Sequence, residues 1–291
     1  MRYSHFLALA LALGGTGLAA TTDATAQTAR GVRETAEASM TLGGRIDIGA
    51  EGQVTGFQLE HAGKVPADLA AFVTRQVQSW RFEPVRVDGA PVASQTPVIL
   101  RLVQRPDPNG DGAQVRVTGA SFARYDPNDT SRVTIGAMPP PTYPRDVYAM
   151  KGRGEVLLLV KVARDGTAAD VFTEQVNLRV VGNEKQMRAM REALARASEA
   201  AARRWTFRPP TTGRGKDAES WNVRVPVQYA MGQRRAERYG VWEAYIPGPR
   251  ERAPFSQAAA SDTAAPDLLA DGGIYMADHD DGPRLLTPLG G

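Results

Sequence analysis

Apolar and polar residues alternate and then recur at helical spacing in the first part of the chain. Residues 45–48 and 54–59 alternate with a period of two and flank a turn at Gly52, which predicts a β-hairpin. A helix is predicted to follow Pro66, with apolar residues three or four apart at Leu69, Phe72, Val73 and Val77. An Asp88-Gly89 hairpin turn then leads to a strand at 98–102.

The same order returns between residues 155 and 229. A strongly apolar strand at 155–162 is turned by Asp165-Gly166 and followed by a returning strand at 169–175. A long helix over 184–203 has a stripe of apolar and small residues at Met187, Met190, Leu194, Ala197 and Ala201. The last strand, 221–229, contains Pro226, and proline is tolerated in sheets mainly at edges, so we expect this strand to border solvent.

Both predicted helices lead into the same short motif, Trp-x-Phe-x-Pro. Two residues that are two apart on an extended backbone point to the same face, and the proline then ends the element. Since large aromatic side chains dominate core burial, we expect these four residues to be core residues of a repeated unit: Trp80, Phe82, Trp205 and Phe207.

The repeated order predicts an α+β fold made of two small units, each an antiparallel sheet packed against one amphipathic helix. The first unit is expected at residues 41–104 and the second at 136–231. The connector between them, 105–135, is rich in Pro, Asn, Asp and Gly and holds two short strand patterns at 114–118 and 132–135. Units of this size bury only a limited core.

The two ends of the chain differ from these units. Residues 1–26 contain an apolar run at 6–13, several glycines and a cleavage signal before Gln27, as in a secretory signal peptide. An uncleaved membrane anchor is the alternative, although the run is shorter than the roughly 20 residues that span a bilayer. Residues 27–40 are expected to be a flexible lead, and residues 232–291 a mostly disordered tail.

Composition narrows the chemistry that is possible. The chain has no cysteine, which excludes disulfides, thiol catalysis and the usual structural zinc sites. Its net charge is +3, from 35 Lys and Arg residues against 32 Asp and Glu residues spread along the chain. So small a basic excess gives no reason to expect a nucleic-acid partner.

Candidate catalytic and metal-binding groups are few. No serine has a plausible paired base, and no phosphate-binding or dinucleotide-binding glycine motif occurs, so we expect no enzyme activity and no cofactor. Two acidic segments partly match metal-binding patterns. Asp107, Asn109 and Asp111 match the first half of a calcium loop, but Thr118 stands where a bidentate Glu is required. His279 lies among aspartates in the predicted tail, where no rigid scaffold supports a ligand set. We therefore expect no metal.

The motifs of the second unit, taken in order, resemble the C-terminal domain of TonB, the energy transducer. The resemblance covers about residues 138–231 and rests on Tyr143-Pro144, the strand start Gly154-Glu155-Val156, Asp165-Gly166, the helix, the Trp205-x-Phe207-x-Pro209 motif and the alternating strand that ends at Tyr229. Residues 41–102 resemble the same domain in degenerate form, because they keep Gly52, the helix and the first Trp-x-Phe-x-Pro motif but have no Tyr-Pro lead.

In the TonB family the last strand of this domain accepts a short segment of an outer-membrane transporter by strand addition, which draws its affinity from main-chain hydrogen bonds. The resemblance implies a partner-binding site here at Tyr143, Pro144, Arg145, Trp221, Asn222, Val223, Arg224, Val225, Val227, Gln228 and Tyr229. It also implies a periplasmic location and an outer-membrane TonB-dependent transporter as the partner, linked to energised transmembrane transport.

The N-terminal part departs from a full transducer, which has an uncleaved membrane helix and a long Pro-rich spacer. Residues 27–41 contain no proline, and the segment before them looks cleavable. A second function therefore stays open: a non-transducing periplasmic scaffold or assembly module that binds another envelope protein, or forms a homodimer, through the same edge. If residues 1–26 are retained, the protein is anchored in the inner membrane and faces the periplasm.

Overall fold

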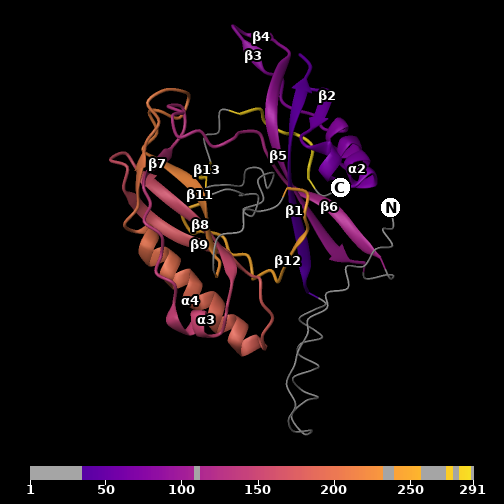
Figure 1. The fold of residues 1–291 in the computed structure, drawn as a ribbon. Coiled ribbons are helices and arrows are strands. Elements are labelled where there is room, and N and C mark those ends of the chain that lie inside the picture. The colour runs from indigo at the N-terminus through magenta and orange to yellow at the C-terminus, as the bar shows by residue number, and fades with distance from the viewer. Residues whose placement is uncertain (1–34, 108–111, 232–238, 257–272, 278–281, 290–291) are drawn as a thin grey trace.

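The chain forms an α+β fold in the computed structural model, as the sequence predicts (Figure 1). The structure describes residues 35–107, 112–231, 239–256, 273–277 and 282–289. Two antiparallel sheets each carry one main helix, and α2 and α4 lie on the sides of their sheets that face away from the other unit (Figure 1). The predicted signal peptide, residues 1–26, lies outside the described residues.

The first unit contains the predicted hairpin, helix and strand. In chain order its elements are β1 (Glu37–Ile48), β2 (Val54–Leu59), the 3₁₀ helix η1 (Ala62–Lys64), α2 (Ala67–Gln78), β3 (Arg86–Val87), β4 (Ala90–Pro91), β5 (Ser94–Pro106) and β6 (Ala113–Ser121). The antiparallel order of the sheet is β2–β1–β5–β6. The turn between β3 and β4 is the predicted Asp88-Gly89 turn, and both of its residues have positive φ angles.

The boundary predicted after residue 104 is wrong, because β6 belongs to the sheet of the first unit. β6 pairs with β5 over eight residue pairs, from Ile99 with Ser121 to Pro106 with Ala113. Val117 and Ala120 on β6 are buried in the same core as α2. Between β5 and β6 the amide of Asp107 donates to the carbonyl of Gly112 at 2.9 Å.

The second unit also follows its predicted order. Its elements are β7 (Thr134–Ala137), α3 (Arg145–Ala149), β8 (Gly154–Ala163), β9 (Ala168–Leu178), α4 (Glu184–Ala202), β10 (Thr206–Arg208) and β11 (Ser220–Tyr229). The sheet has the order β9–β8–β11–β13, and β10 pairs with β7 beside it. Asn183 and Gln186 form a capping box at the start of α4, which satisfies two backbone amides that would otherwise lack partners.

Parts of the predicted C-terminal tail are strands of the two sheets, so the prediction of disorder is wrong for them. β12 (Glu243–Tyr245) pairs with the start of β1, and β13 (Tyr275–Met276) pairs with β11. Leu285 forms a bridge with Phe82 of the first unit. Tyr245, Ile274 and Leu285 are each at least 94% buried. These scattered apolar residues fill positions that the two units leave open, which local composition does not reveal.

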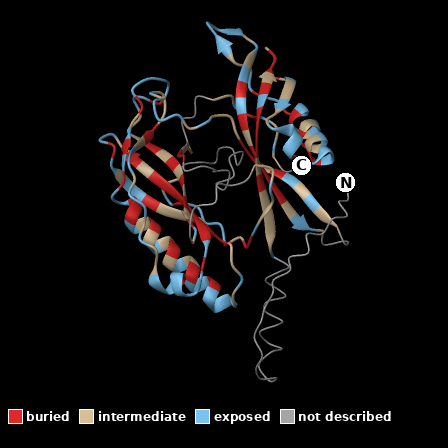
Figure 2. Cartoon of the chain, in the orientation of Figure 1, coloured by how far each residue is buried: buried red, intermediate tan, exposed pale blue. Residues whose placement is uncertain are grey.

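Each unit has its own hydrophobic core between its sheet and its helix. Trp80 and Phe82 are buried in the first core and Trp205 and Phe207 in the second, as predicted. Figure 2 shows buried residues along the strands of both sheets and on the inner side of α4, whose outer side is exposed. Within the described ranges, no helix is both long enough and apolar enough to cross a membrane.

Candidate functional site

The strand that the sequence marks for partner binding, β11, lies between β8 and β13. It pairs with β8 over ten residue pairs, from Ser220 with Ala163 to Tyr229 with Gly154. On its other side β13 pairs only with Val223 and Arg224. Among the described residues, β13 thus pairs with two residues at the outer edge of β11, whereas β8 pairs with β11 over its whole length.

Successive residues of β11 direct their backbone N–H and C=O groups alternately to the outer edge, where β13 lies, and to β8. The amide of Ala277, just after β13, donates to the carbonyl of Asn222 at 2.8 Å. In an antiparallel pair, alternate residues direct their N–H and C=O groups to the same side. Asn222, Arg224, Pro226 and Gln228 therefore direct their backbone groups to the outer edge, and the residues between them direct theirs to β8.

Pro226 belongs to the outer set, so its missing N–H leaves the β8 ladder intact. The hydrogen-bonded pairs with the tail strand fall at Asn222 with Ala277 and at Arg224 with Tyr275. The next such position on β11 is Pro226, which has no amide hydrogen to donate. Because the missing N–H of Pro226 faces the outer edge, a proline is tolerated inside β11. The same missing N–H explains why the pairing with β13 stops there.

Five of the eight predicted partner-binding residues on β11 are core residues. Five side chains face α4 and are buried in the second core: Trp221, Val223, Val225, Val227 and Tyr229. The indole N–H of Trp221 donates to the carbonyl of Gly215 at 2.8 Å. Their backbone groups point to β8, so these residues contribute neither side chains nor hydrogen-bonding groups to the outer edge. Of the predicted strand residues, Asn222, Arg224 and Gln228 do so through their backbone.

Arg224 has its side chain engaged on the sheet face that lies away from α4. Its guanidinium forms an ion pair with Glu174 of β9, with Nε to Oε2 at 2.8 Å and a second contact at 3.3 Å. The two side chains are only 14% and 6% exposed. Because a buried charge needs its partner, Arg224 stabilises the sheet through its side chain and can serve a partner only through its backbone.

The structure brings the predicted Tyr-Pro lead to the end of β11. The ring of Tyr143 lies edge-on to Tyr229, with centroids 5.2 Å apart, and also edge-on to Tyr148 at 5.6 Å. The Tyr143 hydroxyl donates to the carbonyl of Gly152, and the Tyr229 hydroxyl lies 2.9 Å from the Ser198 hydroxyl of α4. Burial raises the pKa of both Tyr143 and Tyr229, so both phenols keep their protons at neutral pH.

Two large apolar side chains next to this aromatic stack are exposed. Tyr148 is 59% exposed and Met150 is 40% exposed, both at α3. Pro144 precedes α3, and Arg145, its first residue, is also exposed. The predicted site therefore divides into a backbone edge on β11 and a mixed surface at α3.

The sequence analysis missed the residues that already occupy this edge. Ile274 is 95% buried in the second core, and Met276 is partly buried against the same core. Between them, Tyr275 lies opposite Arg224. The only sequence signal is the pair of apolar residues two apart in a stretch otherwise rich in Asp and Gly.

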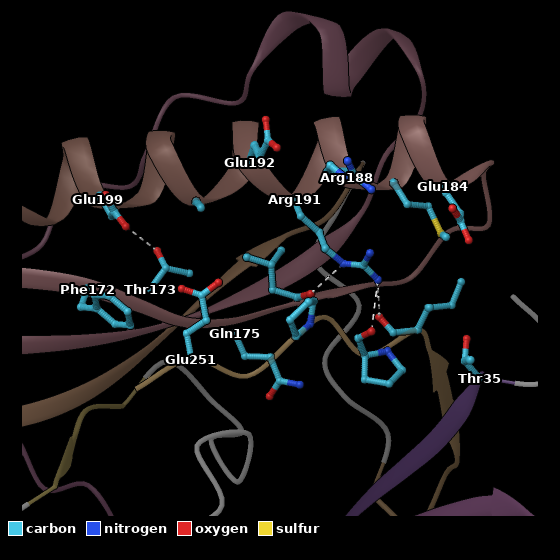
Figure 3. A pocket seen from close by; sticks show the side chains of 16 residues that line it. Thr35, Phe172, Thr173, Gln175, Glu184, Arg188, Arg191, Glu192, Glu199 and Glu251 are labelled. Atoms are coloured by element: carbon cyan, nitrogen blue, oxygen red, sulfur yellow. Dashed lines mark hydrogen bonds between the residues drawn. The ribbon is translucent and has the colours of Figure 1, made fainter. Parts of the chain in front are cut away.

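Apart from this edge, a hollow of about 1140 Å³ lies between α4 and the edge strand β9 (Figure 3). The guanidinium of Arg191 projects from α4 and donates to the carbonyls of Val176, Ile246 and Pro247 at 3.1 to 3.5 Å. Burial lowers the pKa of Arg191. Its role is to fasten the segment after β12 to β9, because all three hydrogen bonds are to backbone carbonyls.

The rim of this hollow carries charges of both signs. Glu199 accepts a hydrogen bond from Thr173 at 2.7 Å and also pairs with Arg203 (Figure 3). Glu192 pairs with Arg196 on the same helix. Charges of both signs on one rim do not select one kind of ligand.

Metal binding finds no support in the part of the chain that the structure describes, where no group of three or more His, Asp or Glu side chains could hold an ion. Asn109, Asp111 and His279 lie outside that part, so the expectation that neither acidic segment binds a metal stays a prediction. Comparisons with protein-family models, curated proteins and solved structures find no match for this chain. The TonB resemblance thus rests on the sequence motifs.

Proposed function

We propose that this protein is a periplasmic TonB-like protein that binds an extended segment of an outer-membrane TonB-dependent transporter by strand addition at the outer edge of β11. One observation carries the proposal: the edge already accepts a strand, β13, by main-chain pairing. Recognition of this kind takes its affinity from backbone hydrogen bonds and its specificity from alternate side chains.

The repeat itself indicates which unit binds. β5 is the strand of the first unit that corresponds to β11, and its outer edge is covered by β6 over eight residue pairs. β11 has only two pairs with β13. A strand from another protein can replace two pairs far more readily than eight, so the second unit is the binding unit and the first is self-completed.

Export is the second part of the proposal. The signal-peptide pattern in residues 1–26 and the absence of cysteine suit a protein that works in the periplasm without disulfides. In this location the edge of β11 can meet a transporter segment on the inner side of the outer membrane. Contact with an inner-membrane motor would require that residues 1–26 be retained as an anchor.

The test is a titration of ¹⁵N-labelled protein with a synthetic peptide from the periplasmic segment of a TonB-dependent transporter. The amides of Asn222, Arg224 and Gln228 should shift, because their N–H groups point to the outer edge. A Gln228→Pro variant should bind less tightly, since it removes an outer donor. Arg116→Ala on β6 is the matched control and should bind as the parent protein does. Unchanged edge amides at saturating peptide would overturn the proposal.

The same edge also suits the alternative use, a scaffold that pairs two copies of the chain or binds another envelope protein. An exposed edge can form a continuous sheet across a homodimer as well as with a peptide. Concentration-dependent sedimentation that is lost in the Gln228→Pro variant would favour this alternative. A monomer at all concentrations that still binds the transporter peptide would favour the transporter.

A further inference from the structure

β13 has both features of a strand-addition ligand, although it belongs to the same chain. Its backbone pairs with β11, and the residues on either side of Tyr275 place apolar side chains against the second core. We propose that β13 is an internal ligand of the partner-binding edge, which the partner strand must displace, and that the partner carries apolar residues two apart in the places of Ile274 and Met276. The inference rests on the strand addition proposed above.

The register shows where the partner's side chains would lie. Because Asn222 with Ala277 and Arg224 with Tyr275 are the hydrogen-bonded pairs, Val223 and Met276 form a non-hydrogen-bonded pair, in which side chains lie closest. Val223 is fully buried on the α4 side of the sheet. Met276, and Ile274 two residues before it, share that side.

The walls of this docking place come from the segment before β7. Tyr125 and Val133 line the same small cavity as Ile274 and Met276. The Tyr125 hydroxyl accepts a hydrogen bond from the amide of Ile135 at 3.0 Å, which fixes the ring beside β7. A partner residue in the place of Ile274 would therefore meet Tyr125 and Val133 in a cavity that charged residues also line: Arg124, Asp126, Asp129 and Arg132.

β13 pairs with few residues of β11, so another strand can replace it at this edge. Its pairing covers Val223 and Arg224, and one further backbone bond joins Ala277 to Asn222. Pro226 prevents the ladder from continuing on the same hydrogen-bonding pattern.

The first experiment uses β13 itself as the probe. The capped peptide acetyl-Gly-Ile-Tyr-Met-Ala-amide, which reproduces residues 273–277, is titrated into ¹⁵N-labelled full-length protein. The Ile274→Ser/Met276→Ser double variant should bind it, with shifts at Asn222 and Arg224, because its own strand no longer docks. The parent protein and the Leu286→Ser control, which changes an exposed tail leucine, should bind at least tenfold more weakly.

The second experiment locks β13 in place. The chain has no cysteine, so Val223→Cys/Met276→Cys gives a single possible disulfide at a non-hydrogen-bonded pair, where Cα atoms lie about 4.5 Å apart. The oxidised protein should lose binding of the transporter peptide, and reduction should restore it. Circular dichroism of both forms checks that the fold is retained.

The outcomes separate the two proposals. The inference is overturned if the double serine variant keeps slow hydrogen exchange at the Ala277 amide and takes up no peptide, or if the oxidised disulfide form binds the transporter peptide as well as the reduced form does. If the β13 peptide binds the double serine variant while the transporter peptide binds no form, the internal ligand stands and the transporter is the wrong partner.

Discussion

The amide of Phe207 donates to the carbonyl of Gly166 at 2.8 Å, and the amide of Phe82 donates to that of Gly52 at 2.7 Å. Gly166 is the positive-φ residue of the turn between β8 and β9, and Gly52 is that of the turn between β1 and β2. The Phe of each Trp-x-Phe motif therefore clamps the hairpin turn of its own unit by its backbone while its ring enters the core. The repeat in the sequence is a repeat of this contact.

This contact predicts a specific stability loss for Gly166→Ala. A Cβ at residue 166 would lie 2.3 Å from the Phe207 carbonyl oxygen, and φ is +81°. Gly89 also has φ +81° but has nothing within 4 Å, so Gly89→Ala isolates the cost of the dihedral angle, about 1 kcal/mol. We expect Gly166→Ala to lower the free energy of unfolding by at least about 2 kcal/mol more in urea titrations, because the backbone must shift. Equal losses would contradict the clamp.

The buried ion pair between Arg224 and Glu174 predicts strong coupling. Glu174→Gln should lower the free energy of unfolding by about 3–5 kcal/mol, because it leaves the guanidinium without its countercharge in a site that is 14% exposed. The double variant Glu174→Leu/Arg224→Leu should recover most of this loss, because neither charge remains. A double-mutant cycle of Glu174→Leu, Arg224→Leu and their double variant in urea measures the coupling, and additive losses would show that the two residues do not interact.

The buried phenol of Tyr229 predicts a loss of stability at alkaline pH. Its pKa is raised above the ordinary value of 10.0, mainly by burial, so the folded state holds its proton more tightly than the unfolded state does. The stabilisation is complete below the unfolded pKa and is lost as pH rises through the folded pKa. Urea midpoints from about pH 7 to about pH 11 should fall less steeply for Tyr229→Phe than for the parent protein. If the urea midpoints of the two proteins fell in parallel with pH, the alkaline loss of stability could not be assigned to Tyr229.

Pro226 predicts a gain of edge pairing when it is replaced. Pro226→Val restores an outer N–H, so β13 should extend its ladder, and hydrogen exchange at the Ala277 amide should slow. The matched variant Val227→Pro instead removes an amide that points to β8, and it should destabilise the whole second unit. An unchanged exchange rate in Pro226→Val would mean that something other than the missing donor ends β13.

The N-terminal mass of the protein from native envelopes tests its location. Cleavage before Gln27 is expected, which gives a free periplasmic protein. An intact N-terminus in the membrane fraction would instead indicate an inner-membrane anchor, and direct contact with a motor would become the favoured interpretation.

Sequence patterns predicted most of the local structure. The hairpin at Gly52, the helix that ends before Trp80 and the long helix that starts at Glu184 all lie where the spacing of apolar residues places them, because period and turn chemistry are local properties. The Tyr-Pro lead was predicted to lie near the last strand, and Tyr143 does contact Tyr229. The buried face of β11 follows from its alternation of apolar and polar residues, whereas the strongly apolar β8 is buried on both faces.

Only the tertiary structure decided how the sheets end. Pairing of β6 with β5, of β13 with β11 and of Leu285 with Phe82 joins segments by backbone hydrogen bonds, which any residue except proline can donate and which therefore leave little trace in the sequence. The sequence alone determined the two repeated units and their cores. Tertiary pairing decided that β6 covers the outer edge of β5 over eight residue pairs, whereas β13 pairs with two residues of β11. Such pairing depends on long-range geometry and not on local sequence.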